Sequence, residues 1–130
     1  MKTIINQHGV SSMSLDQTIF NRVAAHLLAQ GRPSLSDNEG ECAYRGEDDL
    51  RCAVGCLIDD AHYSEALEGY SVQHGDVVQA VKSSLGLQHL APRTADLLGD
   101  LQLLHDLTPP EEWREGLKAL ARQYDLELTV

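Results

Sequence analysis

The hydrophobic residues of this chain recur with the spacing of an α-helix in several separate stretches. The first stretch starts at Ser14, where Ser14 and Gln17 have the spacing of a capping box. Gly31 marks its end, because glycine readily adopts the left-handed conformation that closes a helix, and Pro33 blocks continuation. The apolar stripe of this predicted helix consists of Ile19, Phe20, Val23, Ala24, Leu27 and Leu28.

Further helices are predicted in the second half of the chain. One covers residues 71–85 and is closed by Gly86, and the next covers residues 93–107 with Pro92 in its first turn. A second capping box over residues 108–111 opens the last helix. The helix over 93–107 has a broad apolar face, wide enough to be mostly buried; its members are Ala95, Leu97, Leu98, Leu101, Leu104 and Leu107. The last helix carries on one side Trp113, Leu117, Leu120, Ala121 and Tyr124.

The centre of the chain lacks a helical period. Two short alternating runs, residues 42–45 and 50–52, flank a turn rich in Gly and Asp, and this pattern predicts a small β-hairpin near residues 42–52. The apolar run over 53–58 fits a buried strand or a buried helix, and we favour a short helix because no β pattern follows it. Gly55 within this run is tolerable if another backbone packs closely against it.

These elements predict a mainly α protein, a compact helical domain over residues 14–130 with one small β-hairpin. Residues 1–13 are expected to form an N-terminal extension, and the alternating tail over 126–130 is compatible with an added edge strand. A chain of 130 residues buries about two thirds of its unfolded surface, so neither a metal nor a disulfide is needed for folding.

The composition argues against several functional classes. The chain has twenty Asp and Glu residues and ten Lys and Arg residues, which gives a formal net charge of −10. This charge repels phosphates, so direct nucleic-acid binding is not expected. No apolar run approaches the roughly 18 residues of a membrane span. The apolar stretch within residues 1–13 is too short for a secretory signal, so we do not expect export. Three cysteines, an odd number, without an export signal favour reduced thiols. We therefore expect a cytoplasmic protein that does not contact membranes.

Acidic residues concentrate in one segment. Residues 37–68 hold ten of the twenty acids and only two arginines, a local balance of −8, together with all three cysteines. We expect the functional site here. The candidate binding residues are Tyr44, Arg45, Glu47, Asp48, Asp49, Arg51, Asp59, Asp60, Tyr63 and Glu68.

Two of these candidates leave alternatives open. Tyr44 and Arg45, exposed on a hairpin, would suit a protein-binding hot spot, because both combine a large contact area with a polar end. Equally, Arg45 would pair with a neighbouring acid while Tyr44 packs beneath it. The acid pairs at 48–49 and 59–60 fit hydrolase or cation sites, but turns and helix caps also favour Asp, and we prefer that simpler explanation.

The cysteines suggest metal or thiol chemistry. Cys42, Cys52, Cys56 and His62 offer four zinc ligands, but their spacing matches no standard zinc motif. A reactive thiolate needs a base or a positive neighbourhood, and the surrounding carboxylates instead raise a thiol pKa. We favour small buried hydrophobic residues, as free cysteines usually are, and predict no cofactor, metal ligand or catalytic residue.

The central motifs resemble a known group of proteins. They read C-x-Y-R-G over residues 42–46 and L-x-C-A-V-G-C-L-I over residues 50–58, followed by Tyr63 and Glu68-Gly69. The pattern resembles small phage and prophage proteins that join an amphipathic N-terminal helix, a C-x-YRG…KCAVGCLI centre and a helical tail. The resemblance covers most of the chain from Leu15 onward, with Arg51 where such proteins often have Lys. It implies a phage or mobile-element accessory protein inside a bacterial host, and no reaction.

The sequence thus favours binding over catalysis. We call the surface formed by the acidic segment 37–68 the central face. We predict that it binds a basic surface on a host or phage protein, since complementary charge raises the rate of association. An oligomer is compatible with this prediction. The alternative is a small enzyme, or a ligand- or metal-binding protein, that uses the region of Cys42, Cys52 and Cys56.

Overall fold

A computed structural model describes residues 14–36 and 40–130 of the chain. Its α-helices are α1 (Leu15–Gln30), α2 (Gly75–Leu85), α3 (Pro92–Leu107) and α4 (Trp113–Gln123). Single 3-10 turns are η1 (Glu47–Asp49), η2 (Gly55–Leu57), η3 (Glu65–Leu67) and η4 (Pro110–Glu112). The prediction of a mainly helical protein is confirmed, whereas the predicted N-terminal extension, residues 1–13, lies outside the described residues.

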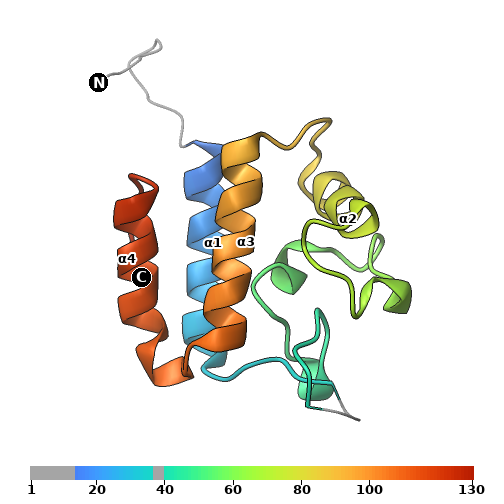
Figure 1. Ribbon diagram of the computed structural model, residues 1–130, viewed down its shortest axis with the longest axis horizontal. Helices are drawn as coiled ribbons and strands as arrows, with labels where there is room; N and C mark the ends of the chain where they lie inside the picture. Colours follow the sequence, from blue (N-terminus) through green and yellow to red (C-terminus); the bar gives the residue numbers. More distant parts are fainter. Residues whose placement is uncertain (1–13, 37–39) are drawn as a thin grey trace.

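Three of the helices, α1, α3 and α4, pack against one another as a bundle, and α2 lies on the far side of α3 from α4 (Figure 1). The segment between α1 and α2 runs as loops and 3-10 turns along the same flank as α2, with η2 against α1. The centre of the core is made of large, fully buried side chains. They include Phe20, Leu27, Leu57, Leu97, Leu101, Trp113 and Leu117.

Helix α1 begins and ends where the sequence predicts, but only the Ser14 half of the capping box forms, because the Gln17 side chain bonds Asn21 and Glu127. The Ser14 hydroxyl accepts a hydrogen bond from the Gln17 backbone N–H at 3.1 Å, and Gly31 closes the helix with a φ of 72°. The second predicted capping box does not form. Thr108 instead ends α3, and its carbonyl accepts the indole N–H of Trp113 at 2.9 Å. The 3-10 turn η4 then separates α3 from α4. Helix α2 begins later than predicted, after His74, whose ring nitrogen accepts the Asp76 N–H.

The predicted β-hairpin is wrong: the described residues pair here only through isolated bridges, Arg45 with Arg51 and Leu35 with Cys42. Side chains take up the backbone groups that a ladder would need. The N–H groups of Tyr44 and Arg45 donate to the Glu68 carboxylate, and the N–H of Arg51 donates to the Gln30 amide oxygen. These three donors are therefore not available to a strand partner.

The tail also lacks the edge strand that its alternation is compatible with. Over residues 126–130 no strand forms, and Gln17 of α1 takes the place of a partner strand. Its side chain accepts from the Glu127 N–H at 2.9 Å and donates to the Glu127 carbonyl at 2.8 Å. This pair fastens the end of the described chain to the first turn of the bundle.

The apolar run over residues 53–58 forms one 3-10 turn, η2, and most of its side chains are buried. Gly55 is needed there because a Cβ atom at this position would collide with the carbonyl group of Tyr44. The close backbone approach expected from the sequence is therefore present. It places residues 42–45 directly over η2.

Gly55→Ala is expected to lower the free energy of unfolding by about 2–3 kcal/mol, because backbone atoms of Tyr44 cannot rotate out of the way. Urea denaturation followed by circular dichroism measures the change. The matched control is Gly75→Ala, since nothing lies within 4 Å of its Cβ position; this variant should shift stability by less than about 1 kcal/mol. Equal stability of the two variants would contradict the close contact.

Candidate functional site

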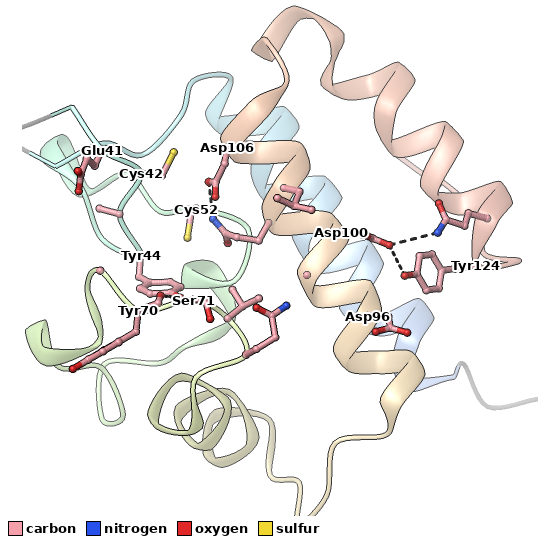
Figure 2. A pocket seen from close by; sticks show the side chains of 18 residues that line it. Glu41, Cys42, Tyr44, Cys52, Tyr70, Ser71, Asp96, Asp100, Asp106 and Tyr124 are labelled. Atoms are coloured by element: carbon pink, nitrogen blue, oxygen red, sulfur yellow. Dashed lines mark hydrogen bonds between the residues drawn. The ribbon is translucent and has the colours of Figure 1, made fainter.

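A pocket of about 690 Å³ opens between the loop segments and α3 (Figure 2). Residues 41–44 and 69–73 form one wall, and α3 with the end of α4 forms the other. Its volume lies within the range of roughly 300–1,000 Å³ typical of small-ligand sites. The pocket is therefore the principal candidate for a functional site in the described part of the chain.

The lining of the pocket is acidic. Four carboxylates reach it, from Glu41, Asp96, Asp100 and Asp106, and no Lys or Arg of residues 14–36 and 40–130 lines it. The aromatic part of the lining consists of Tyr44, Tyr70 and Tyr124. Because a cleft concentrates the field of like charges, this pocket attracts cations and repels anions.

Asp106 receives hydrogen bonds from several neighbours. The ring Nδ1 of His105 lies 2.8 Å from its carboxylate, and the Gln102 amide donates at 2.9 Å. Partial burial acts to raise the pKa of Asp106, but hydrogen bonds from His105, Cys42 and Gln102 outweigh it and hold the pKa below its usual value. Asp106 therefore stays ionised at the edge of the pocket.

The tautomer of His105 follows from its other contact. Its Nε2 accepts the backbone N–H of Ser34 at 2.9 Å, so the proton of the neutral ring lies on Nδ1 and points at Asp106. The ring is almost fully buried and stacks on Trp113, with ring centroids 5.6 Å apart. This arrangement fixes both the ring and the start of the loop that follows α1.

The thiols are not activated as nucleophiles. Burial, followed by the hydrogen bond to Asp106, raises the pKa of Cys42 to about 12. Burial also raises the pKa of Cys56 to about 12, and it raises that of Cys52 further. Thiolate chemistry needs a lowered pKa, so this arrangement does not favour it.

The four ligands considered for zinc from the sequence do not come together in the described residues. The Cys56 thiol donates to the Ala53 carbonyl, and His62 pairs with Asp59. Cys42 lies instead beside His105 and Asp106, whose donor atoms are all within 4.8 Å of one another. The proton on His105 Nδ1 removes the lone pair that a metal would need there, so this trio does not fit a metal in its present bonding.

Several predicted binding residues lie inside the molecule's own contacts. Tyr44 is 6% exposed, and its hydroxyl donates to the Tyr70 carbonyl at 2.6 Å. Arg45 lies 4.3 Å from the centre of the Tyr63 ring and bonds the Ile58 carbonyl. Of the two alternatives for these residues, the structure therefore shows Arg45 paired and Tyr44 packed.

Glu68 connects these residues. One carboxylate oxygen accepts the Tyr44 N–H at 2.9 Å; the other accepts the Arg45 N–H at 3.1 Å and the Tyr63 hydroxyl at 2.6 Å. The carboxylate thus ties the 42–45 segment to the 63–68 segment. It is a structural residue, although it counts toward the acidity of the segment.

The predicted acids that remain on the surface are Glu47, Asp48, Asp49, Asp59 and Asp60. Some are compensated by neighbours. Asp60 lies 2.8 Å from Arg45 and 3.6 Å from Arg51, and Asp48 lies 3.4 Å from Arg32. Arg45 and Arg51 are already counted in the balance of −8, so these pairs leave that balance unchanged and place positive charge beside Asp48 and Asp60.

The pocket residues on α3 and α4 were missed by sequence reasoning. Asp96 and Asp100 lie one turn apart, opposite the apolar face of α3, and this spacing is visible in the sequence. Nothing in the sequence shows that residues 41–44 lie across from them, because that contact joins distant parts of the chain (Figure 2).

Comparison of the chain with models of protein families, with characterised proteins and with solved structures finds no match. Among the described residues, no helix combines the length and apolarity that crossing a bilayer requires.

Glu68→Gln is expected to lower the free energy of unfolding by about 2–3 kcal/mol, because the amide keeps only one acceptor for three donors. Urea denaturation measures the loss. Glu65→Gln, an exposed change in the same segment, is the control and should be nearly neutral. A neutral Glu68→Gln would show that the carboxylate does not hold these segments.

Asp106→Asn is expected to lower stability by about 1–2 kcal/mol at neutral pH. Because the folded pKa of Asp106 lies below its unfolded value, its contribution is complete above about pH 5 and is lost as the pH falls through the folded pKa. In urea denaturation at several pH values, the stabilities of the two proteins should therefore converge as the pH falls through the folded pKa of Asp106. Glu127→Gln is the control, and a difference that persists unchanged in acid would contradict this assignment.

Proposed function

We propose that this protein is a non-catalytic binding protein, a phage or prophage accessory factor that engages a basic surface of a host or phage protein in the bacterial cytoplasm. The observation that carries the proposal is the pocket beside α3, whose lining in the described part of the chain holds four carboxylates and no Lys or Arg. The resemblance of the central motifs to small phage proteins supports the biological setting.

The pocket is better suited to this role than the central face alone. On the central face, arginines already pair with Asp48 and Asp60. In the pocket, the donors to Asp100 are neutral, the Tyr124 hydroxyl at 2.6 Å and the Gln123 amide at 3.5 Å. The negative charge of the pocket is therefore available to an incoming cation.

The chemistry of the walls favours an Arg or Lys side chain. A guanidinium or ammonium group forms charge-assisted hydrogen bonds with carboxylates, and four carboxylates line this pocket. Charge complementarity of this kind raises the association rate and selects the partner. The raised thiol pKa values and the protonated Nδ1 of His105 favour binding over thiol or metal chemistry at this site.

Binding of an arginine-rich peptide to the whole protein tests the proposal by isothermal titration calorimetry. We expect binding that weakens as salt increases, because exposed charges are screened. Glu41→Gln/Asp96→Asn, which removes two exposed pocket carboxylates, should weaken affinity about tenfold. Free arginine and a polyamine serve as further titrants, and preferential binding of either would indicate a small-molecule site.

The matched control is Glu47→Gln/Asp49→Asn, which removes the same charge from the central face at η1. It should reduce peptide affinity much less than the pocket variant. A larger loss in this control would place recognition on the central face instead of the pocket. Absence of peptide binding at low salt would overturn the proposed function.

A further inference from the structure

An exposed apolar ridge runs along α3 next to the pocket. Leu103 and Leu107, one helical turn apart, are 53% and 76% exposed and are the most exposed large hydrophobic side chains in the described part of the chain. The sequence places Leu107 on the buried face of this helix, and the structure leaves it in solvent. By helical spacing, Asp96 and Asp100 continue the same line toward the start of α3.

A second hollow, of about 350 Å³, lies on the other side of this ridge, between α3 and α4. The α4 side of this hollow carries no charged side chain; its residues are Gly116, Ala119, Leu120 and Gln123. The end of the Leu104 side chain packs against Gly116, and a Cβ atom there would require this side chain to move. The result is a shallow apolar groove beside the leucine ridge.

The groove and the acidic pocket form one continuous surface. Asp100, Leu103 and Gln123 line both. Crossing α3 therefore leads from four carboxylates on one side to apolar side chains on the other. Asp100 and Leu103 lie about one helical turn apart on α3. A ligand that covers both would therefore need a cationic group and an apolar group at a similar spacing.

The charge of the surface distinguishes between possible occupants. A second copy of this chain, with a net charge of −10, would bring its own α3 carboxylates against Asp96 and Asp100. Such like-charge contacts are costly. A segment with Lys or Arg beside its apolar stripe would instead gain from both halves of the surface.

We propose that the Leu103–Leu107 ridge and the α3–α4 groove dock an amphipathic helix of the basic partner. The apolar residues of this helix, spaced i, i+3 or i+4, cover the two leucines, and a neighbouring Lys or Arg reaches the acidic pocket. This inference rests on the proposed function and adds the secondary structure and apolar face of the partner segment.

Two synthetic probe peptides of about four helical turns test the inference. Both contain the same Leu and Lys residues, in one arranged as an amphipathic helix and in the other scrambled to remove the helical period. Calorimetric titration of the whole protein at about 0.15 M salt should show about tenfold tighter binding of the amphipathic peptide. Leu103→Ser/Leu107→Ser should abolish that preference. Leu107→Ser alone, at a residue outside the acidic pocket, should weaken the preference and leave the affinity for the scrambled peptide unchanged.

The matched control is Leu15→Ser/Val130→Ser, which removes two other exposed apolar side chains and should retain the preference. Equal affinity of the two peptides, or a preference that survives the loss of both ridge leucines, would overturn the inference. If the pocket acids still contributed to binding of the scrambled peptide in that case, the proposed function would remain and only the further inference would fail. Failure of both peptides to bind would overturn both proposals.

Sedimentation of the unbound protein tests the competing occupant. We expect a monomer whose sedimentation is unchanged by Leu103→Ser/Leu107→Ser. A dimer that these substitutions dissociate would assign the ridge to a second copy and overturn the inference.

Discussion

The carboxylate of Glu68 fixes the part of the molecule that has no regular secondary structure. It accepts the backbone N–H groups of Tyr44 and Arg45 and the hydroxyl of Tyr63, and so joins the two loop segments beside the pocket. A second link, from the Tyr44 hydroxyl to the Tyr70 carbonyl, connects residues 41–44 with residues 69–73 within the same pocket wall. These loops therefore depend on side-chain acceptors where a sheet would use backbone carbonyls.

The same arrangement explains why total charge and surface charge differ in the central segment. Arg45 is held over Tyr63 and reaches Asp60, which Arg51 also approaches. The two basic side chains of the segment, Arg45 and Arg51, therefore make these contacts within the segment itself. On α3, by contrast, carboxylates line a pocket to which the described residues contribute no Lys or Arg. Three of the four pocket carboxylates, Asp96, Asp100 and Asp106, lie outside the stretch that contains the most acids.

The sequence predicts those features that depend on local patterning. The limits of α1 follow from Ser14 and Gly31, and the mainly helical class follows from the period of the apolar residues. The hairpin fails because Glu68, far from it in sequence, takes the donors that a strand would use. The pocket also cannot be predicted from local patterning, because the contact between Cys42 and Asp106 depends on how distant elements pack.

The cross-linked wall has an energetic consequence for recognition. Because Glu68 and Tyr44 already hold the loops in place, an incoming side chain meets a surface whose conformational entropy was lost during folding. Association then carries little additional ordering penalty on this side, and more of the contact energy appears as affinity. Loosening the wall would weaken recognition even where every contacting atom was unchanged.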